Sequence, residues 1–447
     1  MPHKVDNAPQ CPYSSLRVDR SSKVPRSERD LPSATCPYSF LDTDASTTTT
    51  KPWRPDADDF ACQTETDPDK LREMYADLRE KCPVAFSSEY GGFYALTRHA
   101  DIAAAAQDSA TFISSVKAVV PSDPRGLRRP PLNYDAPNHT PYRTALDRTL
   151  KPARLAALKA RLEEHSHFEL KKMLDAGGGD FAGEYGARFP AWAETAWLNL
   201  EDDAAPVLSE TAARWIRAWR KQEAEQVRIN SEKLYDIARQ LVADRKVEPQ
   251  DVEIDPASSL LAERPDGQPL EEANIVGCLR QALVVGMVAP PLLLGAIAKH
   301  LATDPALQQQ LRENPDDVPA ACEEFIRLYS PYRGFARTVS QPIVLHGRRI
   351  DPGMPVTMTY IAANRDPEVF PSPDEFILHR PNIALHLGFG KGRHRCAGSQ
   401  LARMIVQVAV RDLLEATESF ELAGECEGAL MPECGIISCP LVMVPRV

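Results

Sequence analysis

The sequence has no cysteine between Cys82 and Cys278, and its ten cysteines are spread over 447 residues. This spacing lacks the density of a disulfide-stabilised secreted domain and fits a reducing compartment. The first sixty residues also lack an apolar segment followed by a small-residue cleavage site. We therefore expect a cytoplasmic protein rather than a secreted one.

The sequence has fewer basic than acidic residues, with 52 Lys and Arg against 63 Asp and Glu, so its formal net charge is -11. This balance disfavours a general nucleic-acid surface but permits a local basic patch. The one long uncharged apolar stretch, residues 282–298, is shorter than the ~20 residues that a membrane span needs, and it contains Pro290 and Pro291. We expect a buried helix there and no membrane span.

Two regions differ in composition. Residues 1–60 are rich in Ser, Thr, Pro and Asp, which predicts a disordered polar leader; it contains the tetrapeptide CPYS twice, at Cys11 and Cys36. From Asp67 onward, long helical patterns alternate with short strand-like segments around Gly and Pro turns. Residues 61–447 are therefore predicted to form a single domain that is mainly α with small β-sheets.

Candidate chemistry is concentrated in HLGFGKGRHRCAGSQLARM, residues 386–404. Glycines at 388, 390 and 392 precede Cys396, and Gly398 follows it, so the backbone can approach a flat ligand closely. The composition after Ala397 is helical. A cysteine just ahead of a helix has its thiolate stabilised by the free amides, which favours a soft, anionic metal ligand. A cysteine alone is more often an inert core residue, so the spacing must decide.

The segment FGKGRHRCAG, residues 389–398, resembles the haem-binding loop of cytochromes P450, F-G-x-G-x-H-x-C-x-G. The resemblance covers roughly residues 67–447 and is to the soluble, bacterial-type class. It implies the P450 fold and heme b whose iron is bound by the Cys396 thiolate, with Phe389, His394 and Gly398 beside the cofactor. Thiolate ligation favours O–O cleavage, so the resemblance implies an oxidoreductase, expected to be a monooxygenase of secondary metabolism.

Other segments resemble parts of the same family in the same order. Glu324 and Arg327 stand where its E-x-x-R helix lies, and Arg380 stands where its third partner usually sits. This implies a buried cluster that supports the cysteine loop, although the same spacing often makes a surface ion pair. The resemblance also implies partners for the haem propionates, namely His139, Arg143, Arg337 and His394.

The helix expected to cross the distal face of the haem departs from the family. The family usually carries a small residue, a glycine, any residue, an acid and a threonine. These positions are filled here by Val285, Gly286, Met287, Val288 and Ala289. Neither relay group is present, so proton delivery must come from elsewhere. Substrate or water could supply the protons, peroxide could drive a peroxygenase reaction, or the enzyme could be a redox-neutral lyase, isomerase or oxidative coupling enzyme. A non-catalytic haem sensor or carrier is a further alternative.

The prolines bear on this departure. Pro290 and Pro291 deprive the carbonyls of Gly286 and Met287 of their helical donors, so backbone could replace side chains as the polar part of the pocket. Prolines that only bend the helix are an equal alternative. We expect the substrate pocket to be lined by Val285, Met287, Pro290, Arg333 and Ile436. If Arg333 points inward, it would select an anionic small molecule.

Basic residues gather near the cysteine loop in the sequence. They are Lys391, Arg393, Arg395 and Arg403, with Arg148, Lys151 and Arg154 after the propionate helix. In the resembling fold these residues lie on the proximal face, which suits an acidic electron donor of the ferredoxin or flavodoxin type or a reductase. No reductase segment is visible in the sequence, so electrons are expected from a separate protein, from peroxide or from a direct reductant.

Overall fold

The computed structural model describes residues 59–122 and 128–446. Most of the predicted leader, with Cys11 and Cys36, lies outside these residues. The chain is packed into the domain from the first described residues. The Asp59 amide donates to the Phe86 carbonyl at 2.9 Å, and Phe60 is 7% exposed.

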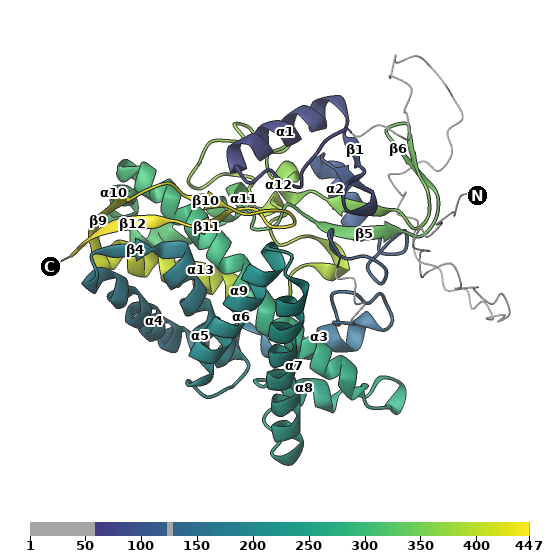
Figure 1. The fold of residues 1–447 in the computed structure, drawn as a ribbon, viewed down its shortest axis with the longest axis horizontal. Coiled ribbons are helices and arrows are strands. Elements are labelled where there is room, and N and C mark those ends of the chain that lie inside the picture. The colour runs from purple at the N-terminus through teal and green to yellow at the C-terminus, as the bar shows by residue number, and fades with distance from the viewer. Residues whose placement is uncertain (1–58, 123–127, 447) are drawn as a thin grey trace, which may run out of the picture. The chain divides into compact units, whose positions relative to one another are not determined.

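Helices dominate the described part of the chain (Figure 1). They are α1 (Pro68–Lys81), α2 (His99–Gln107), α3 (His139–Thr149), α4 (Pro152–Asp175), α5 (Gly186–Trp197), α6 (Ala204–Arg220), α7 (Ala224–Val247), α8 (Pro256–Ala262), α9 (Glu272–Thr303), α10 (Pro305–Glu313), α11 (Val318–Leu328), α12 (Tyr360–Ala363) and α13 (Ser399–Ala416). The predicted mainly α composition is confirmed.

The strands are short. They are β1 (Val84–Ser87), β2 (Phe93–Leu96), β3 (Phe112–Ile113), β4 (Gly178–Asp180), β5 (Phe335–Val339), β6 (Ile343–Leu345), β7 (Arg348–Ile350), β8 (Pro355–Met358), β9 (Thr417–Leu422), β10 (Glu427–Gly428), β11 (Ile436–Ser438) and β12 (Pro440–Pro445). The largest sheet has the order β1-β2-β8-β5-β3, with β2 and β8 parallel and the other pairs antiparallel. It joins early and late segments of the chain, and every residue of β2 and β8 is buried.

The apolar stretch forms the middle of α9, which packs against α5, α6, α7 and α13. α9 is long and apolar enough to cross a membrane, but 72% of its most apolar window is buried inside the protein. Both prolines lie within the helix, and Pro291 packs against the start of α5, where a side chain on Gly186 would come within 3.3 Å of its Cα. The predicted buried helix is therefore confirmed, and α5 packs against it at Pro291.

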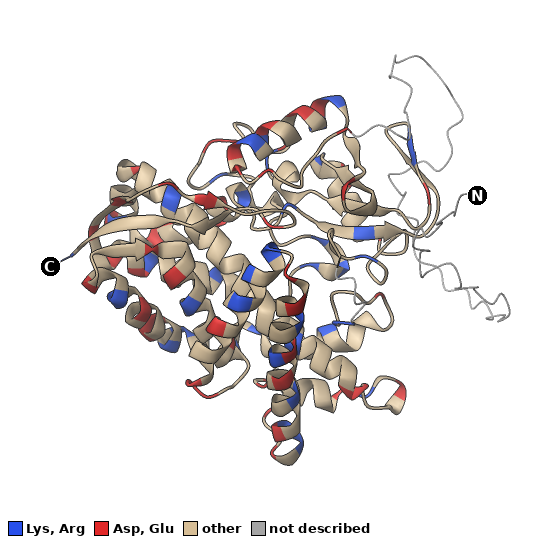
Figure 2. Cartoon of the chain, viewed as in Figure 1, with Lys and Arg blue, Asp and Glu red and all other residues tan. Residues whose placement is uncertain are grey.

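Charges of both signs are interleaved along the exposed helix α7 (Figure 2). Arg239 pairs with Glu232 at 2.7 Å and with Asp236 at 2.6 Å. Such exposed pairs contribute little to stability and keep the face solvated. This helix therefore carries no single-sign field of the kind that nucleic acid attracts.

Candidate functional site

The cysteine loop, residues 386–398, runs from the 3-10 turn η5 (Ile383–Leu385) to α13. The short 3-10 turn η6 (Gly392–His394) lies within it, and the Cys396 amide donates to the Phe389 carbonyl at 2.9 Å. Gly390 and Gly392 have φ of 68° and 72°, values that favour glycine, and a side chain at 392 would collide with the Ala106 carbonyl at 2.0 Å. Gly398 differs, since open space surrounds its missing side chain and its φ is −78°. The loop is thus held by backbone geometry, and the space beside Gly398 is free for a flat ligand.

Cys396 is the one exposed cysteine among the eight in the described residues. Burial nevertheless raises the pKa of its thiol; the Gly398 amide and the charges of Arg143, Arg395 and Arg403 oppose this without overcoming it. The Cys396 side chain is thus accessible, although many protein atoms surround its sulfur. The helix terminus does not by itself make a thiolate, contrary to the simplest expectation, because desolvation is the larger effect; a bound metal ion deprotonates a coordinating thiol directly.

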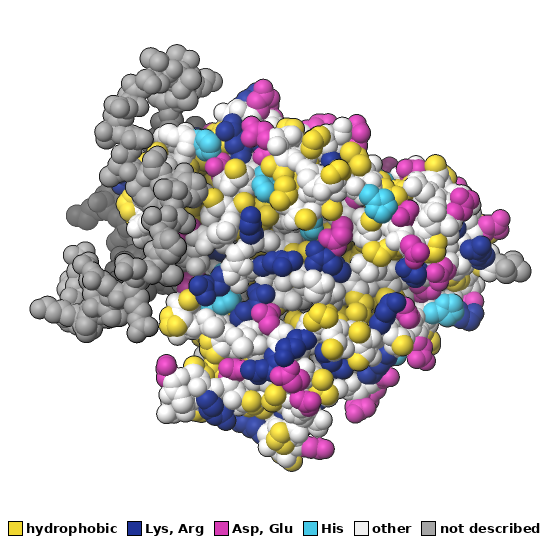
Figure 3. All heavy atoms as spheres, turned by 180° about the vertical axis from the view of Figure 1, so that it is seen from behind, with side chains coloured by type: hydrophobic (Ala, Val, Ile, Leu, Met, Phe, Trp, Pro, Cys, Tyr) yellow, Lys and Arg dark blue, Asp and Glu magenta, His cyan; other side chains and the backbone are white. Residues whose placement is uncertain are grey.

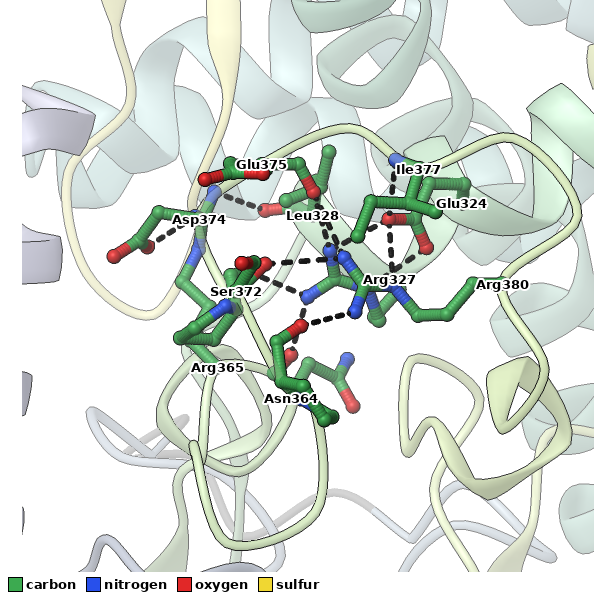
Figure 4. Close-up of polar contacts among 12 residues, drawn as sticks. Glu324, Arg327, Leu328, Asn364, Arg365, Ser372, Asp374, Glu375, Ile377 and Arg380 are labelled. Carbon is green, nitrogen blue, oxygen red and sulfur yellow. Dashed lines mark hydrogen bonds and ion pairs between the residues drawn. The ribbon is translucent and has the colours of Figure 1, made fainter.

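Glu324, Arg327 and Arg380 form one buried cluster (Figure 4). Arg327 donates to the two Glu324 oxygens at 2.8 and 2.7 Å, and Arg380 Nε lies 2.9 Å from Oε1. Burial would raise the pKa of Glu324, but the hydrogen bonds and charges of the two arginines hold it below its usual range. The surface ion-pair alternative is wrong, since none of the three side chains is more than 2% exposed.

The remaining arginine donors are used by backbone. Arg327 donates to the carbonyls of Asn364 and Pro373 at 2.8 and 2.7 Å, and Arg380 to those of Pro371 and Glu375 at 2.5 and 2.9 Å. The cluster therefore fixes the course of the chain that leads into the cysteine loop.

Asn364 is a supporting residue that the motif reading missed. Its Oδ1 accepts from the Leu387 amide at 2.6 Å, and its Nδ2 donates to Ser330 Oγ at 2.8 Å. Asn364 lies in the segment ANRDPEVF, which resembles the family, but nothing local in the sequence indicates that its side chain reaches the loop.

Three of the four predicted propionate partners meet as a buried group. The rings of His139 and His394 lie 4.5 Å apart and Arg337 is 5% exposed. Within the described residues, both ring nitrogens of His139 and Nε2 of His394 lack hydrogen-bond partners, and Arg337 donates only to the Ala336 carbonyl. Burial and then neighbouring arginines lower the pKa of His139 to about 4 and that of His394 to about 3.

Such a group needs an anion. Asp135 lies 3.9 Å from His394 Nε2, but its oxygens accept from the amides of Ser114 and Ser115 at 2.8 and 3.0 Å. Buried donors without acceptors are costly, and two carboxylates would satisfy them. Together with the exposed Cys396 thiol, these donors fit haem with its propionates.

Arg143 has other partners. It pairs with Asp147 at 2.8 Å and donates to the Arg395 carbonyl at 2.5 Å. The structure therefore places this guanidinium on the backbone of the cysteine loop.

The distal helix positions divide between two environments. Val285 is 44% exposed, and Gly286 and Ala289 are partly exposed, so they line the open face of α9. Met287 and Val288, at 2% and 6% exposed, belong to the hydrophobic core. Pro290 is also buried. The expectation that Met287 and Pro290 face the pocket is therefore wrong, because the i and i+4 spacing turns Val285 and Ala289 together to the open side.

Two further pocket assignments are corrected. Arg333 is fully buried and donates to the backbone carbonyls of Glu433, Cys62, Glu65 and Ala429, so it has a structural role and recognises no anion. Ile436 is 2% exposed and packs against Gly295, where an added side chain would meet its carbonyl at 2.6 Å; Gly295 lies six residues after Ala289 in α9.

Known proteins resemble this chain in sequence and in fold. The family model described as Cytochrome P450 matches residues 194–425. The chain is 28% identical to cyclomarin C epoxidase from Salinispora arenicola, over 79% of this chain and 90% of that protein, and 26% identical to linalool 8-monooxygenase from Pseudomonas putida, over the same shares. The crystal structure of CYP108D1 from Novosphingobium aromaticivorans superposes with a TM-score of 0.75 at 25% identity, over 84% of this chain and 95% of that one.

Proposed function

The chain belongs to the cytochrome P450 family, and from this premise we propose that it is a cytoplasmic monooxygenase that oxidises a small organic molecule without the family's usual proton-delivery pair. The family binds heme b through a cysteine thiolate, which is Cys396 in this chain. The bound thiolate haem supplies oxygen activation. Around it, His139, His394 and Arg337 would hold the propionates, and the Glu324 cluster would keep the loop in place.

The proposal rests on one observation about α9. Val288 is buried in the core, and Ala289 lies with Val285 and Gly286 on the open face; because valine and alanine carry no donor, neither the acid position nor the threonine position presents a proton-donating group. The backbone carbonyls freed by Pro290 and Pro291 remain as acceptors for water or for a polar group of the substrate.

Product analysis under isotopic oxygen tests the reaction class. We expect one labelled oxygen atom in the product and consumption of both O2 and NAD(P)H, after a Soret-shift screen has identified a ligand. Unlabelled product formed without reductant would instead support a redox-neutral reaction, and turnover supported by peroxide alone would support a peroxygenase.

Substitution at the ligand and distal positions tests the residues. Cys396→His should abolish the reduced-CO band of thiolate haem, whereas Cys82→Ser, at a partly exposed thiol elsewhere, should keep it. The double variant Val288→Asp with Ala289→Thr should change the ratio of product to reductant consumed. An unchanged ratio would mean that proton delivery never limits this enzyme.

An electron-donor protein is proposed to dock beside the cysteine loop. Lys391, Arg393 and Arg395 are exposed and form no ion pair with described residues, whereas Arg148 and Lys151 are neutralised by Glu263 and Glu253. Lys and Arg side chains also gather across the middle of the rear view (Figure 3). Lys391→Glu should weaken reduction by an acidic ferredoxin or flavodoxin and reduce its salt dependence, with Lys171→Glu as the control.

A further inference from the structure

A buried carboxyl from α5 lies against the distal helix α9 at Gly286. Glu194 is 4% exposed, and a Cβ atom on Gly286 would lie 1.6 Å from its Oε1 and 2.2 Å from its Cδ. The carboxyl therefore occupies the space that a side chain at position 286 would need. This contact is a physical reason for glycine at this position, independent of any ligand.

Among the described residues, no charged group pairs with this carboxyl. In the part of the chain that the structure describes, Oε2 of Glu194 has no hydrogen-bond partner. Burial alone raises its pKa to about 8, and no charged group of α4, α6 or α9 contributes to the shift. An uncharged side chain of similar size would fill this space at a lower cost in stability, and buried acids with displaced pKa values concentrate at functional sites.

The backbone beside this carboxyl carries a carbonyl that lacks a hydrogen-bond donor from the helix. Pro290 has no N–H, so the Gly286 carbonyl lacks its usual i+4 donor. Gly286 is partly exposed, and its neighbour Val285 is 44% exposed toward the open face. The protonated Glu194 carboxyl lacks an acceptor among the described residues, and the Gly286 carbonyl lacks its helical donor. Both groups belong to the contact at Gly286, where a bridging water would satisfy both.

We infer that Glu194 is the proton-holding residue of the distal site and takes the place of the absent acid and threonine. Its carboxyl donates a proton through water bound at Gly286 and regains one from solvent. The inference rests on the proposed monooxygenase function, because only oxygen chemistry at the open face of α9 would consume that proton.

Infrared spectroscopy of the haem-loaded protein tests whether the proton is there. A carboxylic C=O band present at pH 7 should titrate near pH 8 and be absent from Glu194→Gln. Glu169→Gln is the matched control, because Glu169 is equally buried but is paired with Lys172 at 2.7 Å and Trp192 at 3.0 Å. A wild-type spectrum in which no band depends on Glu194 would overturn the inference.

Coupling measurements test what the proton does. Glu194→Gln should lower product formed per NAD(P)H at least fivefold and release peroxide, with KM and the ligand-induced Soret shift unchanged, and Glu194→Asp should recover part of the loss. Coupling equal to wild type in Glu194→Gln would overturn the inference. If wild-type protein consumes neither oxygen nor reductant, the proposed function fails, and the infrared result still decides whether Glu194 keeps its proton.

Discussion

Arg403 of α13 pairs with Glu323 of α11, its Nε lying 2.5 Å from Oε1, and its guanidinium covers the Phe389 ring at 4.5 Å. His386 contacts the other Glu323 oxygen at 3.1 Å. Two helices and His386, at the start of the cysteine loop, therefore meet at one carboxylate. Glu323 is adjacent to Glu324 in the sequence, but its partners are His386 and Arg403 rather than Arg327 and Arg380.

Glu323→Gln should lower stability in a pH-dependent way. Burial would raise the pKa of Glu323, but hydrogen bonds from His386 and Arg403 lower it to about 2. Because the pKa of Glu323 is lower in the folded state, its carboxylate stabilises the fold at pH values above the unfolded-state pKa, and this stabilisation is lost as the pH falls toward 2. The variant should therefore have a free energy of unfolding about 2 kcal/mol lower at pH 7 and nearly unchanged near pH 2. Urea unfolding at several pH values measures this. A difference that stays constant with pH would contradict the assigned pair.

Arg327→Lys should lower stability and haem content almost as much as a substitution that removes the charge. Both Glu324 oxygens and three separate carbonyls accept from Arg327, and one ammonium group cannot reach them all. We expect a loss of about 3–5 kcal/mol and reduced haem content, measured by urea unfolding and haem absorbance. Arg214→Lys, in an exposed pair with Glu210, is the control and should change neither.

His139→Phe should have opposite effects on the haem-free and haem-loaded proteins. Removing two buried nitrogens without described partners relieves a desolvation cost, so the haem-free protein should become more stable by about 1 kcal/mol. The loaded protein should lose haem several-fold faster to an acceptor protein, because one propionate partner is gone. His346→Phe, at a histidine paired with Asp101, should not alter haem loss. Equal stabilisation of both forms would refute a propionate role.

The sequence predicts some parts of the site and not others for a physical reason. The loop around Cys396 and the pair at Glu324 are each formed by residues only a few positions apart, so the sequence itself shows them. Arg333 depends on carbonyls contributed by residues 62, 65, 429 and 433, and this convergence exists only after folding. Glu194 lies in AETAW, an ordinary helical pattern, and its importance arises from a glycine far along the chain.

Gly286→Ala and Glu194→Ala should compensate each other. Alone, the added methyl group must displace the Glu194 carboxyl, and such overpacking costs about 1–3 kcal/mol. With Glu194 shortened, the same alanine enters freed space and gains up to about 1 kcal/mol of helix propensity. A double-mutant cycle by urea unfolding should therefore give an interaction energy of about 2 kcal/mol, whereas additivity within about 0.5 kcal/mol would mean that the two side chains do not compete for space. Gly286→Ala alone should also lower coupling of reductant to product, because the displaced carboxyl no longer occupies the space beside Gly286.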